Sequence, residues 1–181
     1  MLYLFLADGF EETEALAPLD CIRRAGIKIL TVGVGSERIA GSHGIEVTAD
    51  ITSDYVDVSE CDGILLPGGM PGTENLYASE EVKNVISFCS ENNKLIASIC
   101  AAPSIPGRMG LLSGKRAVCF PGFEDKLTGH IPSDRPVEKD GCFITAKGAG
   151  CVFPFSREII AYLIDEETAD AVLRKMQYVQ L

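Results

Sequence analysis

The stretch that decides the fold is Lys94-Leu95-Ile96-Ala97-Ser98-Ile99-Cys100-Ala101-Ala102-Pro103. Its apolar run ends in Cys100, small residues follow, and then comes Pro103. This order predicts a buried strand, a sharp turn that carries Cys100, and a helix whose first turn holds Pro103, where the missing N–H of proline costs no hydrogen bond. A turn that lifts one nucleophile above a sheet edge needs small neighbours, and Ser98 and Ala102 supply them.

Cys100 is a candidate nucleophile because of its predicted place at the start of a helix. The helix dipole and the free backbone N–H groups there favour the thiolate form. The alternative is a buried cysteine at a strand end, since free cysteine is among the most buried residue types. The chain has only 2 histidines, His43 and His130, and both stand in loops, where a structural or solvated role is expected.

Composition narrows the class of protein. A length of 181 residues predicts one domain, residues 1–181, and the net charge of −10 argues against nucleic acid and against an anionic membrane surface. No apolar run reaches the ~20 residues that span a bilayer. The apolar start meets Asp8 without a basic leader, so a cytoplasmic location is the expectation. The 7 cysteines include no C-x-x-C pair, which disfavours disulfides and zinc, and no nucleotide-binding fingerprint names a cofactor.

Strands and helices alternate along the chain. Residues 1–7 read as a buried strand, 10–25 as an amphipathic helix and 27–33 as a second strand, which is the unit of a parallel sheet. The pattern predicts an α/β sandwich with helices on both faces of a mostly parallel sheet. Further expected elements are a strand pair in 36–50, strands at 62–69, 94–100 and 115–120, a hairpin around Asp140-Gly141, and helices at 73–76, 79–92, 122–127, 148–163 and 165–178.

A pocket in such a sheet lies beyond the carboxyl ends of the strands. The segments that reach this edge bring carboxylates, flexible backbone N–H groups and a thiol, which together could form a nucleophile, a general acid and an oxyanion hole. These segments are residues 8–14, 67–70, 100–103 and 119–121, joined by the turn at Gly148.

Four motifs carry a family resemblance. They are DGFEETE at 8–14, LLPGG at 65–69, ICAAP at 99–103 and KGAG at 147–150. In this order and spacing, which covers nearly the whole chain, they resemble the DJ-1/ThiJ/PfpI superfamily, on its bacterial DJ-1-like side. The resemblance implies a flavodoxin-like three-layer sandwich, related to class I glutamine amidotransferases, with a nucleophile-elbow cysteine.

The resemblance also implies roles for individual residues. Cys100 would be the nucleophile and redox-sensitive thiol, Glu14 its protonated partner, and the N–H groups of Gly69 and Ala101 the oxyanion hole. Arg24 matches a family arginine near the pocket, and a homodimer with the pocket near its interface is implied. From the residues alone, Glu14 could instead complement a helix N-terminus, and Arg24 a helix C-terminus.

The chain departs from the family pattern at several positions. Phe120 stands where many members have a histidine, and Ala101 replaces the histidine of the peptidase branch, which disfavours a Cys–His dyad and protease activity. The family's Gly-Pro-Gly-Thr turn here ends in Gly150 and Cys151. Cys119, expected on a strand beside that of Cys100, is a candidate resolving thiol. The alternative for Cys119 is a buried core residue.

Three functions are compatible with these residues. The first is a glyoxalase- or deglycase-like enzyme that acts on a small α-oxoaldehyde through Cys100 and Glu14, with no cofactor. The second is a non-catalytic oxidative-stress sensor or chaperone that signals through oxidation of Cys100. The third is a hydrolase or amidase on an unknown metabolite, as the thiazole-phosphate-biosynthesis names of some relatives imply.

Overall fold

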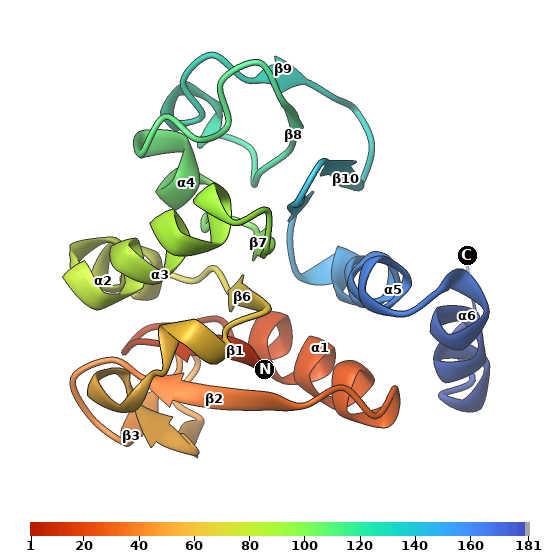
Figure 1. The fold of residues 1–181 in the computed structure, drawn as a ribbon, viewed down its shortest axis with the longest axis horizontal. Coiled ribbons are helices and arrows are strands. Elements are labelled where there is room, and N and C mark those ends of the chain that lie inside the picture. The colour runs from red at the N-terminus through yellow and green to blue at the C-terminus, as the bar shows by residue number, and fades with distance from the viewer. Residues whose placement is uncertain (180–181) are drawn as a thin grey trace.

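The computed structural model describes residues 1–179 and is built on one seven-stranded sheet (Figure 1). The strand order is β10-β11-β7-β6-β1-β2-β5, and every neighbouring pair is parallel except β10 with β11. The predicted α/β, flavodoxin-like fold is confirmed. The strands are β1 (Leu2–Leu6), β2 (Ile29–Gly33), β5 (Ile51–Thr52), β6 (Gly63–Leu66), β7 (Leu95–Ile99), β10 (Val137–Asp140) and β11 (Phe143–Ala146).

Helices cover both faces of the sheet, as Figure 1 shows. One face carries α1 and α5, with α6 packed against these two helices, and the other carries α2, α3 and α4. Among the described residues, no helix has the length and apolar character to cross a bilayer. The helices are α1 (Glu12–Arg24), α2 (Gly72–Ala78), α3 (Glu80–Glu91), α4 (Ser104–Arg108), α5 (Val152–Leu163) and α6 (Glu166–Lys175), with 3-10 turns at Ser53–Tyr55, Val58–Glu60, Glu124–Lys126 and Ala149–Cys151.

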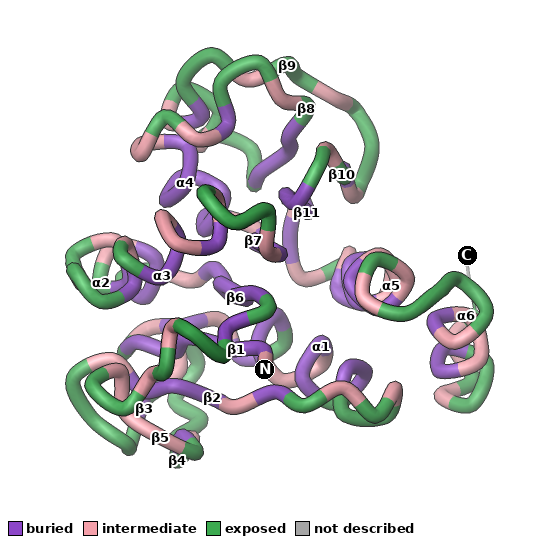
Figure 2. Tube along the Cα trace, viewed as in Figure 1, coloured by how far each residue is buried: buried purple, intermediate pink, exposed green. Residues whose placement is uncertain are grey.

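Strand β1 shows why the central strands read as continuous apolar runs. Leu2, Leu4 and Leu6 enter the core on the α1 face, and Tyr3 and Phe5 enter the core on the α3 face. Successive side chains of a strand point to opposite faces, so a strand covered on both sides must be apolar throughout. Figure 2 shows the central strands as buried between the helical layers. Each fully buried side chain of this kind contributes about 1.5–3 kcal/mol.

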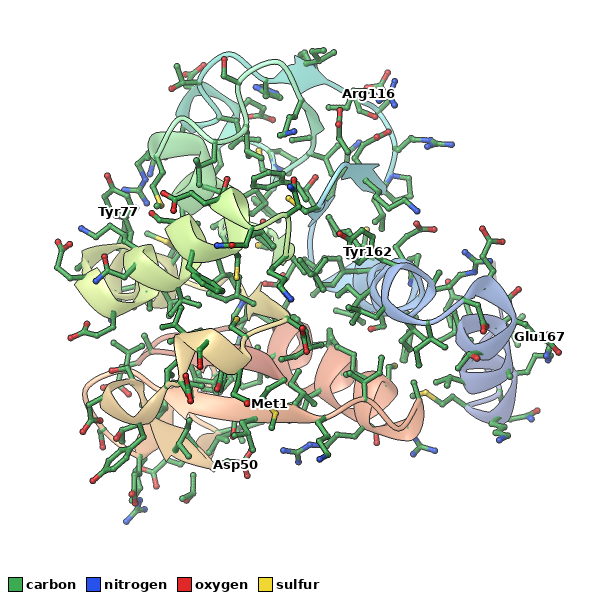
Figure 3. All side chains as sticks on the ribbon, in the orientation of Figure 1. Met1, Asp50, Tyr77, Arg116, Tyr162 and Glu167 are labelled. Carbon is green, nitrogen blue, oxygen red and sulfur yellow. The ribbon has the colours of Figure 1, made fainter. Side chains whose placement is uncertain are left out.

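The segment after the elbow differs from the prediction. The strand expected at 115–120 is only β8 (Arg116–Ala117), which pairs with β9 (Ile131–Pro132) outside the main sheet. Arg116 lies at the periphery of the molecule (Figure 3). The physical reason is that β7, the strand that leads to Cys100, already has β6 and β11 as its two neighbours, so no edge is free beside it. The remaining small sheet pairs β3 (Arg38–Ala40) with β4 (Glu46–Thr48), as predicted.

The helix that follows Cys100 begins one residue later than expected. Pro103 is the N-cap of α4 rather than a member of its first turn. Pro106 falls within the first turn of this short helix, where no intrahelical partner is lost, and the helix ends two residues later at Arg108. The hairpin expected around Asp140-Gly141 is present as β10 and β11.

Candidate active site

Cys100 occupies a sharp elbow directly after β7. Its φ is 63°, a left-handed conformation that non-glycine residues rarely adopt and that marks functional sites. Two backbone hydrogen bonds hold the elbow: the Cys100 N–H donates to Ala146 O at 2.9 Å, and the Phe120 N–H donates to Cys100 O at 2.7 Å. The side chain is half-buried, and the flanking Ser98 and Ala102 are fully buried.

Glu14 reaches the thiol from the first turn of α1. Its side chain is only 3% exposed and forms a hydrogen bond with the Cys100 thiol. The Gly68 N–H donates to Glu14 Oε2 at 2.9 Å, and the backbone of Ala149 makes a further hydrogen bond to the carboxyl group. Burial raises the pKa of Glu14 to about 7, although these hydrogen bonds act in the opposite direction.

The carboxyl group of Glu14 also affects the pKa of the thiol. Burial, followed by the charge of Glu14 and the hydrogen bond to it, raises the pKa of Cys100 to about 12. Hydrogen bonds from the backbone N–H groups of Ala101 and Gly69 act in the opposite direction. Glu14 therefore loses its proton near pH 7, whereas the thiol of Cys100 keeps its own proton until strongly alkaline pH.

The glycine turn after β6 makes this contact possible. A Cβ on Gly68 would lie 2.6 Å from Glu14 Oε2, 2.7 Å from Cys100 Cβ and 3.0 Å from Cys100 Sγ. Gly69 has a φ of 89°, which favours glycine, and a Cβ there would lie 2.4 Å from Gly9 O. The Pro67-Gly68-Gly69 motif thus provides room for the pair as well as N–H donors.

The structure brings together most of the residues that the sequence analysis selected. Cys100, Glu14, Gly69 and Ala101 meet at the carboxyl edge of the sheet. The Phe120 ring is 47% exposed and lies over Gly148, where a Cβ would be 3.4 Å from the ring. In the 3-10 turn at 149–151, Cys151 is half-buried and Gly150 has open space around its Cα.

Two backbone donors to Glu14 escaped the sequence analysis. The N–H groups of Gly68 and Ala149 carry no side-chain signature, because any residue could supply them. The signal available in the sequence was the glycine at each strand end, Gly68 after β6 and Gly148 after β11, which permits close approach of the backbone.

Arg24 does not belong to this site within the chain, contrary to the expectation from the family resemblance. It lies in the last turn of α1, is half exposed, and its Nε donates to Asp20 Oδ2 at 2.7 Å. Glu14 lies ten residues earlier on the same helix, which corresponds to roughly 15 Å at 1.5 Å per residue. The alternative interpretation, a cation at a helix C-terminus, matches its position.

Cys119 is near the elbow in the chain path but faces another part of the core. It is 5% exposed and belongs to the apolar cluster on the α3 face, whereas Cys100 packs against the cluster on the α1 face. Burial, followed by the charge of Glu124, raises the pKa of Cys119 to about 11. The predicted strand beside that of Cys100 is absent here, and these features favour a core role over a resolving thiol. His130 Nδ1 is 2.7 Å from Leu127 O in its own loop.

Glu12 contrasts with Glu14, two residues away. Its carboxylate accepts hydrogen bonds from the His43 N–H at 2.7 Å, from Ser42 Oγ at 3.3 Å and from the more distant Ile45 N–H at 3.4 Å, with His43 Nδ1 at 2.8 Å. Burial acts to raise its pKa, but the hydrogen bonds outweigh burial and lower the pKa of Glu12 to about 2. Metal-ligating atoms of Glu11, Glu12 and His43 lie within 4.8 Å of one another, but both Glu12 oxygens already accept hydrogen bonds, which indicates an anchor for the turn at 41–45.

We expect Glu12→Gln to destabilise the protein by about 1–3 kcal/mol at pH 7. A carboxyl group whose folded-state pKa is depressed stabilises the fold above its ordinary pKa, and this stabilisation is lost as the pH falls from about 4.5 towards 2. The difference from wild type should therefore shrink over that range in urea unfolding. The exposed Glu46→Gln serves as the control and should cost less than about 0.5 kcal/mol. An undiminished difference at pH 3 would contradict this assignment.

The fold and the site together define a class of protein. It is an α/β sandwich in which an elbow cysteine at a strand end contacts a buried glutamate from the first helix. The chain belongs to the DJ-1/PfpI family, whose model matches residues 1–162. The predicted superfamily is thus confirmed.

Several relatives are similar over most of the chain. Protein dj-1beta of Drosophila melanogaster is 32% identical over 174 residues, which is 94% of this chain and 93% of that protein. A protein named deglycase from Thermococcus kodakarensis is 31% identical over 159 residues, 87% of this chain and 95% of that protein. The chain spans only 44% and 36% of the length of two Arabidopsis thaliana proteins, DJ-1 homologs A and B, at 36% and 34% identity.

Solved structures agree with the fold. A mutant of a DJ-1 superfamily protein from Salmonella typhimurium has a TM-score of 0.94 at 32% identity, covering 99% of this chain and 98% of that chain. Oxidised DJ-1 from Toxoplasma gondii also has a TM-score of 0.94, at 30% identity with the same coverage.

Proposed function

We propose that this chain is a thiol-dependent enzyme that converts small α-oxoaldehydes into 2-hydroxy acids, with Cys100 as nucleophile and Glu14 as proton carrier. The observation that carries the proposal is a buried carboxyl group with a pKa of about 7 that hydrogen-bonds the elbow thiol. A base works best when its pKa is close to the operating pH, and a thiol is activated by an adjacent base.

The reaction proceeds through a covalent adduct. Cys100 Sγ bonds to the aldehyde carbon as its proton passes to Glu14, and the new oxyanion accepts hydrogen bonds from the Gly69 and Ala101 N–H groups. Glu14 returns this proton to the oxyanion, which gives a neutral hemithioacetal. The ionised Glu14 then moves a proton from this carbon to the neighbouring carbonyl carbon, and the product is a thioester of the 2-hydroxy acid. Water hydrolyses the thioester and restores the thiol. Only water is consumed, so these steps need no cofactor.

We also propose a binding partner, an oligomeric state and a location for this protein, all three implied by the family resemblance. The partner is a small aldehyde or a related metabolite, and the protein forms a homodimer in the cytoplasm. A deglycase-like activity uses the same thiol chemistry, and the Thermococcus kodakarensis relative bears that name.

Two other functions are weaker alternatives. The oxidised Toxoplasma gondii relative is in keeping with a redox sensor or chaperone, but a low thiol pKa is what peroxide sensing requires, and burial and Glu14 raise that of Cys100. A hydrolase or amidase would use the same residues. The peptidase form of that activity is disfavoured by Ala101, since the site then lacks an adjacent histidine.

The proposal is tested by Cys100→Ser with methylglyoxal as substrate. We expect lactate formation to fall at least about a thousandfold, because the hydroxyl is a far weaker nucleophile than the thiol. Cys142→Ala is the control, since Cys142 is a buried thiol immediately before β11, and it should retain activity. Wild-type lactate production by Cys100→Ser would refute the proposal.

A further inference from the structure

The ring of Phe120 lies next to Cys100 and Glu14 and is accessible to solvent. Its backbone N–H donates to Cys100 O at 2.7 Å, so the residue is tied to the elbow itself. The ring is 47% exposed. An added Cβ on Gly148 would lie 3.4 Å from Phe120 Cδ2 and 3.9 Å from Glu14 Oε1, so the ring and the carboxyl group flank the same glycine.

A second exposed apolar side chain belongs to a segment that contacts the thiol. Met70 is 49% exposed and follows Gly69, whose N–H bonds the sulfur. Of the eight exposed large apolar side chains among residues 1–179, these two lie on segments joined by hydrogen bonds to Cys100. A partly open thiol with apolar neighbours of this kind favours apolar groups on what it binds.

We propose that Phe120 selects α-oxoaldehydes that carry an aromatic or other bulky apolar substituent, in preference to methylglyoxal. This inference rests on the proposed function and names its substrate class. Once the aldehyde carbon bonds to Sγ and its oxygen meets the N–H groups, Glu14 occupies the buried side. The substituent on the second carbon must therefore extend towards the exposed side, where the Phe120 ring offers an apolar face and no hydrogen-bond donor.

The first test compares kcat/KM for phenylglyoxal and methylglyoxal, taken from initial rates of mandelate and lactate formation before either aldehyde modifies arginines. Phe120→Ala should lower the phenylglyoxal-to-methylglyoxal ratio about five- to tenfold, the size expected from an aromatic contact. Phe120→Tyr should keep the ratio because it keeps the ring. Tyr55→Ala is the control and should leave the ratio unchanged. It also removes an exposed aromatic ring, since Tyr55 is 74% exposed, but this residue belongs to the 3-10 turn at Ser53–Tyr55.

The second test does not depend on turnover. 2-Chloroacetophenone and chloroacetone both alkylate the thiol: the S–C bond forms, the C–Cl bond breaks and chloride leaves. The quantity measured is the rate of 2-chloroacetophenone at Cys100 relative to that of chloroacetone, divided by the same ratio for free cysteine to correct for intrinsic reactivity. This corrected ratio should fall about five- to tenfold in Phe120→Ala and stay unchanged in Phe120→Tyr.

The two tests separate the inference from the function on which it rests. If neither aldehyde is turned over but the haloketone ratio falls in Phe120→Ala, the proposed function fails and the apolar selectivity of Phe120 is supported. If the aldehydes are turned over but both ratios are unchanged in Phe120→Ala, the selectivity inference is overturned. A ratio lost equally in Phe120→Tyr would also overturn it, because the ring is then not the cause.

Discussion

Replacing Glu14 with glutamine is expected to move the midpoint of Cys100 alkylation from about pH 7 to above the ordinary thiol value of about 8.5, with the rate at pH 7 falling about tenfold or more. In the wild type, Glu14 loses its proton near pH 7 and can then accept the proton of the Cys100 thiol as the sulfur attacks, although the pKa of the thiol itself is about 12. Glutamine cannot take that proton. The thiol must then ionise alone, and burial opposes its ionisation.

The measurement is the rate of carbamidomethylation at Cys100, followed by peptide mass spectrometry from pH 5 to 10. Glu81→Gln, an exposed glutamate on α3, is the control for loss of one negative charge from an acidic protein. Its profile should match wild type. A midpoint below pH 7 in Glu14→Gln would show that the carboxylate only suppresses the thiol, and the role of Glu14 as proton carrier would then be wrong.

The sheet could be predicted from the sequence because its central strands are buried on both faces. The runs at 1–7, 62–69 and 94–100 contain strands that are buried along their whole length and predominantly apolar, and the glycines and prolines near their ends mark the turns. The run at 115–120 has a similar local pattern but lies outside the main sheet. That outcome depends on the β10–β11 hairpin occupying the neighbouring position, which is a long-range fact that no local pattern contains.

At the site, too, some features follow from the local sequence and others depend on residues distant in the chain. Glu12 and Glu14 are chemically alike and two residues apart, yet the pKa of Glu12 falls to about 2 and that of Glu14 rises to about 7. The difference arises from donors distant in the chain, chiefly the turn at 41–45 for Glu12. Arg24 is the opposite case, because its distance from Glu14 along one helix was calculable from the sequence alone.

The second large effect is expected at Gly68. Its Cβ position overlaps both members of the reacting pair, at 2.6 Å from Glu14 Oε2 and 2.7 Å from Cys100 Cβ. Real Cβ atoms do not approach so closely, so Gly68→Ala must displace the carboxyl group, the thiol or the turn itself. Because such chemistry is sensitive to displacements of about 1 Å, we expect Cys100 alkylation at pH 7 to fall about a hundredfold, with a stability cost of about 1–3 kcal/mol.

Gly63 provides the matched comparison, because it lies at the other end of β6 and is equally crowded. A Cβ there would lie 2.6 Å from Leu95 Cβ and 3.1 Å from Leu2 Cδ2, far along the strand from the elbow. Gly63→Ala should lose similar stability in urea unfolding and keep its alkylation rate. If both variants lose reactivity together, the loss is caused by the lower stability of the whole fold and not by displacement of the thiol or the carboxyl group. If Gly68→Ala reacts like wild type, the close approach at Gly68 does not position the pair, and the glycine turn has only a structural role.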